Sequence, residues 1–182
     1  MFPNQSDPLG DQVRLLSDEI AETDRRKSGL ALTAVVRAIR ETYPNAVDIA
    51  LVRGSYGLPV LDSITIRVGN DRVTVDGLTL RESMGWSDHR SHTYQISFDA
   101  LIESGLTDVR GPIVAFAQEG PAGDVVNEVV VLIDDFLALP LGLWYPRRPG
   151  EPQLGPDGHR NAVLAALYPP VVPAPADDLA NA

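Results

Sequence analysis

The spacing of apolar residues changes from a helical period to a period of two near Pro44, and this change limits the possible folds. Before Pro44, five apolar residues fall on one face of a helix: Leu32, Val35, Val36, Ile39 and Tyr43. After it, segments with alternating apolar residues predominate, as in strands. No strand is followed by a glycine-rich loop and a helix, which excludes a Rossmann or P-loop arrangement. The order predicts an α+β fold: N-terminal helices, a mainly antiparallel sheet of five to seven strands, and a short C-terminal helix.

Two helices are expected before Pro44. Asp7 is a suitable N-cap and Pro8 suits the first helical position. Val13, Leu16 and Ile20 form an apolar stripe along the first helix. Ser28-Gly29 is expected to break or kink this helix, and a second helix then runs to the residue before Pro44.

The sheet is predicted from short segments separated by turn residues. The clearest hairpin joins two alternating segments through Gly69-Asn70-Asp71. A short helix capped by Asp99 and a last helix near residues 157–168 are also expected. The strands are predicted at residues 46–52, 64–68, 73–75, 92–98, 113–118 and 125–134.

Residues 1–168 are predicted to form one domain, in which residues 140–156 are a loop rich in Pro and Gly. Residues 169–182 are expected to form an extended Pro-rich tail.

Composition excludes several classes of function. The chain carries a formal net charge of -10, no Cys and three His. An acidic chain is a poor binder of phosphate backbones, and without Cys there is no thiolate zinc site, disulfide or Cys nucleophile. No signal peptide is visible, and the most apolar stretch is too short to span a bilayer. We therefore expect a cytoplasmic protein, or one built into an assembly in the cytoplasm, with neither nucleic acid nor membrane as its partner.

The acidic residues are unevenly distributed along the sequence. Residues 99–139 contain eight acids against Arg110, whereas residues 140–168 carry a net charge of +1. If the acids of this segment share one face, we expect a basic protein partner whose binding weakens as salt rises. The candidate acids are Glu119, Asp124, Glu128, Asp134 and Asp135.

The neighbouring loop contains Trp144, Tyr145, Arg147 and Arg148, and these residue types are enriched at the centres of protein interfaces. The loop is therefore a candidate partner-binding segment. In the alternative interpretation, both aromatic residues cover the protein's own core, while the arginines extend along its surface.

Two groups of residues are candidates for metal binding. Asp88, His89 and His92 suit a transition metal if they converge, although a strand would place the two histidines on opposite faces. Asp134 and Asp135 offer oxygen ligands for Mg²⁺ or Ca²⁺. A further possibility is a ligand pocket lined by three aromatic residues: Tyr94, Phe98 and Phe116.

These patterns favour a non-enzymatic, acidic protein-binding or assembly module without a cofactor or bound metal. Such a module would be a structural or adaptor subunit of a bacterial or phage assembly, or an immunity or inhibitor protein. Its partner would be another protein with a basic surface, or copies of itself. The alternative is a small metal-dependent enzyme that uses Asp88, His89 and His92, or Asp134 and Asp135.

Overall fold

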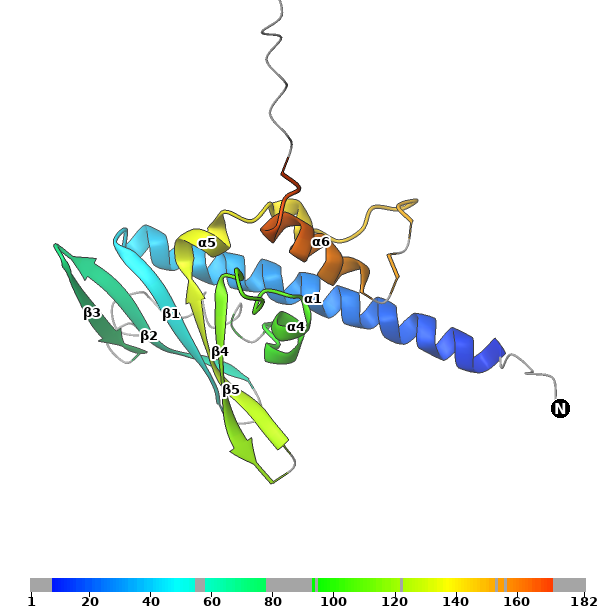
Figure 1. Cartoon of the computed structure of the whole chain (residues 1–182), viewed down its shortest axis with the longest axis horizontal. Coiled ribbons are helices and arrows are strands. Elements are labelled where there is room, and N and C mark those ends of the chain that lie inside the picture. Colours follow the sequence, from blue (N-terminus) through cyan, green and yellow to red (C-terminus); the bar gives the residue numbers. More distant parts are fainter. Residues whose placement is uncertain are drawn as a thin grey trace, which may run out of the picture.

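The protein combines a long N-terminal helix, an antiparallel sheet and a short C-terminal helix (Figure 1), which confirms the predicted α+β class. The computed structural model describes residues 8–54, 58–77, 93, 95–121, 123–152, 154–155 and 157–171. The helices are α1 (Pro8–Thr42), α4 (Phe98–Glu103), α5 (Ile133–Leu137), the 3₁₀ helix η2 (Leu141–Leu143) and α6 (Gly158–Leu167). The strands are β1 (Ala46–Arg53), β2 (Pro59–Val68), β3 (Asp71–Asp76), β4 (Ile113–Gly120) and β5 (Gly123–Leu132).

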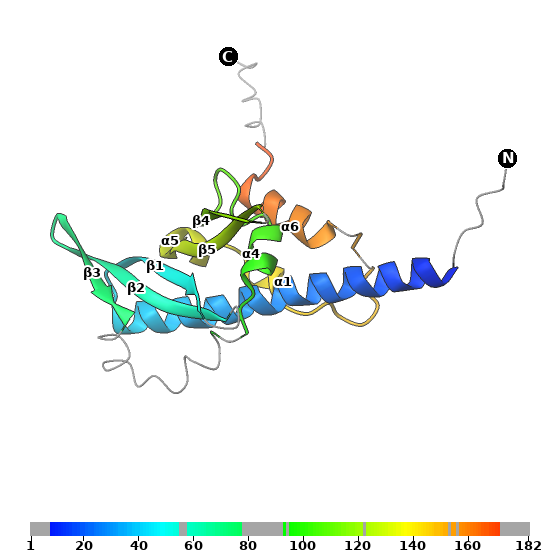
Figure 2. The ribbon, with the colours of Figure 1, turned by 90° about the horizontal axis from the view of Figure 1, so that it is seen from below.

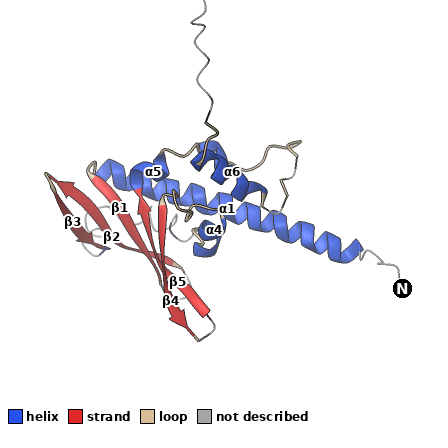
Figure 3. Cartoon of the chain, in the orientation of Figure 1, coloured by secondary structure: helices blue, strands red, loops and turns tan. Residues whose placement is uncertain are grey.

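The five strands of the described residues form one sheet in the order β3-β2-β1-β5-β4 (Figure 3). Every neighbouring pair is antiparallel, so the predicted sheet type is confirmed. The predicted hairpin is β2–β3, in which Gly69 adopts a φ of 64°. Only glycine reaches this backbone conformation without a steric cost.

The core lies between one face of the sheet and the C-terminal half of α1 (Figure 2). Leu32, Val36 and Ile39 project from the helix into the same cluster as the central strand residues Ile49 and Leu51. On the edge strand β4, exposure alternates as expected for a sheet with one buried face. Its residues at 113 and 115 contribute to the core, whereas those at 114 and 116 are exposed.

The predicted break at Ser28-Gly29 is wrong, because α1 continues through both residues as one helix of 35 residues. Both are buried and serve packing instead. The Ser28 hydroxyl accepts a hydrogen bond from the backbone N–H of Ser97 at 3.0 Å. A Cβ atom on Gly29 would lie 2.1 Å from the indole ring of Trp144, so glycine leaves the space that this ring needs.

Two other boundaries differ from the prediction. The strand predicted at residues 92–98 is wrong over its described C-terminal part, where Ser97 caps α4 by accepting a hydrogen bond from the Ala100 N–H. The predicted cap, Asp99, lies in the first turn of this helix instead. The most apolar strand ends at Leu132, and Asp134 and Asp135 lie in the first turn of α5. Asp7 and residues 172–182 of the Pro-rich tail lie outside the described residues.

Candidate functional site

The N-terminal part of α1 projects away from the rest of the described structure (Figures 1 and 2). We call residues 8–21 the arm. At about 1.5 Å per residue, the arm extends roughly 20 Å. It exposes a row of apolar side chains spaced four, three and four residues apart, whose exposed fractions are Leu9 77%, Val13 64%, Leu16 58% and Ile20 62%.

This apolar stripe faces away from the side of α1 that enters the core. At 100° per residue, Leu16 and Ile20 lie about 120° to 180° around the helix from Glu22 and Gly29, which are buried. An amphipathic helix normally turns its apolar face inward, but here the stripe is directed to solvent. Exposed apolar rows of this kind commonly mark a surface that another protein covers.

A buried ion cluster fixes the point where the arm leaves the domain. The Glu22 carboxylate lies 2.9 Å from Nη2 of Arg26 and 3.6 Å from Nε of Arg147. Arg26 also donates a 2.6 Å hydrogen bond to the carbonyl oxygen of Tyr145. Arg147 contributes a second ion pair, at 3.7 Å, to Glu19 on the arm. Because Glu22 and Arg26 are largely buried and paired, whereas the Glu19 side chain is 55% exposed, we expect the pairs of Glu22 to hold the direction of the arm.

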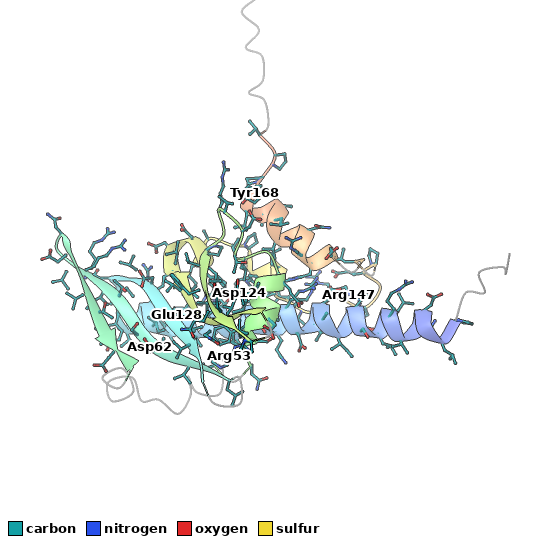
Figure 4. The ribbon with its side chains drawn as sticks, turned by 60° about the horizontal axis from the view of Figure 1, so that its bottom comes forward. Arg53, Asp62, Asp124, Glu128, Arg147 and Tyr168 are labelled. Atoms are coloured by element: carbon teal, nitrogen blue, oxygen red, sulfur yellow. The ribbon has the colours of Figure 1, made fainter. Side chains whose placement is uncertain are left out.

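Two grooves flank α1 where the arm meets the domain. On one side, a groove of about 770 Å³ lies between the helix and the loop that carries Arg147. Figure 4 labels Arg147 on this loop, beside α1. Its wall includes the apolar side chains of Leu30, Trp144 and Pro146. On the other side, a groove of about 320 Å³ lies between α1 and α4. The smaller groove is lined by Ser17, Ile20, Ala21, Asp24, Ser97, Asp99, Ala100 and Glu103.

Trp144 is 1% exposed, so it packs in the core rather than at the surface where we expected a partner. Its ring stacks on Phe136 with centroids 6.0 Å apart and contacts His159 with centroids 5.7 Å apart. The alternative interpretation, that both aromatic residues cover the protein's own core, is correct for Trp144 but not for Tyr145, which is 52% exposed. Tyr145 and Arg148 are exposed on the same loop.

The candidate acids are spread along β5 and beyond rather than gathered. Glu119 and Asp124 face each other across the end of the β4–β5 hairpin, and Glu128 lies in the middle of β5. Asp134, in α5, forms an ion pair with Arg40 of α1, and Asp135 is exposed beside it. Eight residues of strand separate Asp124 from Leu132, which corresponds to roughly 26 Å. Asp134 follows in the first turn of α5.

The metal candidates are only partly within the described residues. Asp88, His89 and His92 lie outside them. Among the described residues, no group of three His, Asp or Glu side chains is close enough to hold a metal ion. Of the three residues of the expected aromatic pocket, Phe98 is buried and Phe116 is 48% exposed, whereas Tyr94 lies outside the described residues.

His159 is a buried titratable group beside the arm junction. One ring nitrogen, Nε2, lies 2.9 Å from the carbonyl oxygen of Leu143, whereas Nδ1 is buried without a hydrogen-bond partner. Burial lowers the pKa of His159, and the nearby positive charge of Arg26 lowers it further. The side chain is therefore held as the neutral imidazole with its proton on Nε2.

Comparison with models of known protein families, with curated proteins and with solved structures gives no match. The helices in the described part of the chain also lack the combination of length and apolar character needed to cross a bilayer.

The sequence pattern identified the stripe but not its exposure. The spacing of Val13, Leu16 and Ile20 is equally typical of a helix that faces a core. Leu9 continues the same spacing one step earlier and could have been included. The smaller groove was not predictable, because it requires α4 to pack beside α1.

Proposed function

We propose that this chain is a non-enzymatic protein-binding or assembly module, and that it binds through the apolar stripe of the arm. The exposure of Val13, Leu16 and Ile20 on a helix that projects from the domain carries this proposal. Four large apolar side chains in one row lose contact with water when a partner covers them, which favours association. The arm supports a structural or adaptor role better than an inhibitor role, because an inhibitor that mimics phosphates needs its acids close together.

The stripe offers a matched pair of variants for testing this proposal. Leu15 is also exposed but lies on a different face of the same helix. We expect Leu16→Glu to abolish binding, because the carboxylate must be desolvated at the interface, and we expect Leu15→Glu to leave it unchanged. The measurement is affinity capture from native lysate with wild-type protein and both variants, quantified by mass spectrometry.

If binding depends on the stripe, the protein captured by the wild type, whether this chain or another protein, is lost from the capture with Leu16→Glu. The same protein is still captured with Leu15→Glu. A wild-type chain that is strictly monomeric and captures nothing would overturn the proposal. The metal-enzyme alternative predicts something different: divalent ions would markedly raise the melting temperature, as expected for a ligand that binds only the folded state.

A further inference from the structure

We infer that the partner of the arm is a second copy of this chain, and that the two arms pair antiparallel as a short coiled coil. This inference rests on the proposed function, since it names the partner of the same stripe. The spacing of four, three and four residues is that of alternating d and a positions in a heptad repeat. Val13 and Ile20 then occupy a positions, and Leu9 and Leu16 occupy d positions.

The stripe is complementary to itself when one helix is reversed. In an antiparallel coiled coil, residues at a positions pack beside residues at d positions of the partner. This register places Val13 beside Leu16 of the other copy and Leu9 beside Ile20, so every apolar residue of the stripe meets another. A two-fold axis repeats each contact, as in most homodimers.

Charges decide between the antiparallel and parallel arrangements, because Val or Ile at a with Leu at d also suits a parallel pair. In the parallel pair, Glu19 at g would face Asp24 at e of the other copy, and Lys27 at a would face its own copy in the seam. Both contacts bring like charges together and oppose pairing. In the antiparallel pair, Glu19 faces Gln12, and Lys27 lies beyond the end of the partner's arm.

The small groove beside α4 strengthens the antiparallel arrangement. It lies on the e side of the seam, where Ser17 and Asp24 belong to both the heptad and the groove wall. The tip of the partner's arm, which begins at Pro8, reaches Ile20 in this register and therefore lies at the groove. The acidic groove residues Asp24, Asp99 and Glu103 also suit the positive end of the partner's helix dipole. Each of these acids has a basic neighbour in its own chain, so the dipole contributes less than the apolar seam.

The small residues at e positions allow the two helices to approach closely. Gly10 and Ser17 occupy these positions, and the antiparallel register places them beside each other across the seam.

Because each arm contributes only four apolar residues, the dimer is expected to be reversible rather than permanent. Its dissociation should be measurable by diluting the full chain.

Charge also predicts how salt affects the dimer. Residues 8–21 contain Asp11, Asp18 and Glu19 against Arg14 alone, so the two arms carry the same sign. Screening this repulsion should leave dimerisation unchanged or strengthen it as salt rises. A basic partner bound to acidic residues would respond in the opposite direction.

The oligomeric state of the full chain tests the inference. Sedimentation equilibrium over a range of concentrations should show a monomer–dimer equilibrium for the wild type and for Leu15→Glu. Leu16→Glu should weaken the dimer about 100-fold, because the two-fold axis introduces the substitution twice at roughly tenfold each. Circular dichroism of both variants checks that α1 remains helical.

Disulfide cross-linking tests the orientation, and the absence of native Cys makes every introduced thiol unique. A mixture of Leu9→Cys and Ile20→Cys chains should cross-link to each other, whereas Leu9→Cys alone should not. Self-cross-linking of Leu9→Cys would show a parallel pair and overturn the arrangement. A wild-type monomer at every concentration would overturn the self-pairing. If the monomer captures a different protein through the stripe, the proposed function is still supported. If it captures nothing, both the self-pairing and the proposed function are overturned.

Discussion

The two halves of α1 form one continuous helix but have opposite relations to solvent. In the C-terminal half, Leu32, Val36 and Ile39 are at most 1% exposed and pack on the sheet. In the arm, Leu16 and Ile20 have comparable apolar side chains but remain more than half exposed. The same residue types therefore stabilise the fold in one half and form the proposed binding surface in the other.

This difference shows that helical periodicity specifies a face but not what covers it. The buried half obtains its stability from tertiary packing, the usual source in proteins. The arm continues a helix that is already nucleated, and local contacts such as the 3.1 Å Arg14–Asp11 ion pair add little because they are exposed. The comparison predicts that the two halves respond very differently to the same substitution.

The largest expected difference concerns leucine truncation. Leu32→Ala should reduce the free energy of unfolding by about 2–5 kcal/mol, because it leaves a cavity in the core. Leu16→Ala should change it by no more than about 0.5 kcal/mol, because the Leu16 side chain is 58% exposed and lies outside the core. Urea denaturation at a concentration where the protein is monomeric gives both values. An equal loss in the two variants would show that the arm packs against its own domain.

A glycine substitution in each half of α1 should sharpen the comparison, because the two substitutions are expected to change stability in opposite directions. Gly29→Ala should destabilise the protein by about 1–3 kcal/mol, because its methyl group would overlap the buried ring of Trp144. Gly10→Ala should stabilise it by at most about 1 kcal/mol, since alanine is the better helix former at an exposed position. Thermal unfolding of both variants provides the test, and a Gly29→Ala protein as stable as the wild type would contradict the packing described here.

The sequence predicted the regular elements better than their connections. Alternating apolar residues predicted the β2–β3 hairpin and the strand β4, because Ile64, Val75 and Ile113 contribute to the core. The errors fall where tertiary packing determines the outcome. Gly29 resembles a helix break, but it makes room for Trp144, and this contact joins residues that are more than 100 positions apart in the sequence.

The candidate site shows the same division. The sequence composition pointed to Trp144 and to the acids of residues 99–139 as binding residues. In the structure, Trp144 is buried and these acids are distributed over several elements. The stripe of Val13, Leu16 and Ile20 was visible as a pattern. Whether the stripe is exposed depends on how far the sheet and α4 extend along α1. A local sequence pattern does not specify this tertiary arrangement.

The smallest expected effect is a pH dependence of the free energy of unfolding, caused by a buried histidine that packs near the C-terminal half of α1. His159 contacts Trp144 there, and burial lowers its pKa below the usual 6.5. The unfolded chain therefore binds a proton more readily than the folded chain once the pH falls below about 6.5. We expect stability to decrease as the pH falls through this value, and His159 to contribute no pH dependence above it.

The His159→Phe variant separates this contribution from that of other groups. It retains a ring beside Trp144 but cannot bind a proton, so its stability should fall less than that of the wild type between pH 7.5 and 5.5. Chemical denaturation at each pH measures the difference. If both proteins lose the same stability, the histidine is not held neutral by burial. We expect this effect to be confined to the buried half of α1, because only that half depends on the packing that protonation disturbs. After correction for intrinsic exchange rates, amide hydrogen exchange at Val13 should therefore respond less to acid than exchange at Val36.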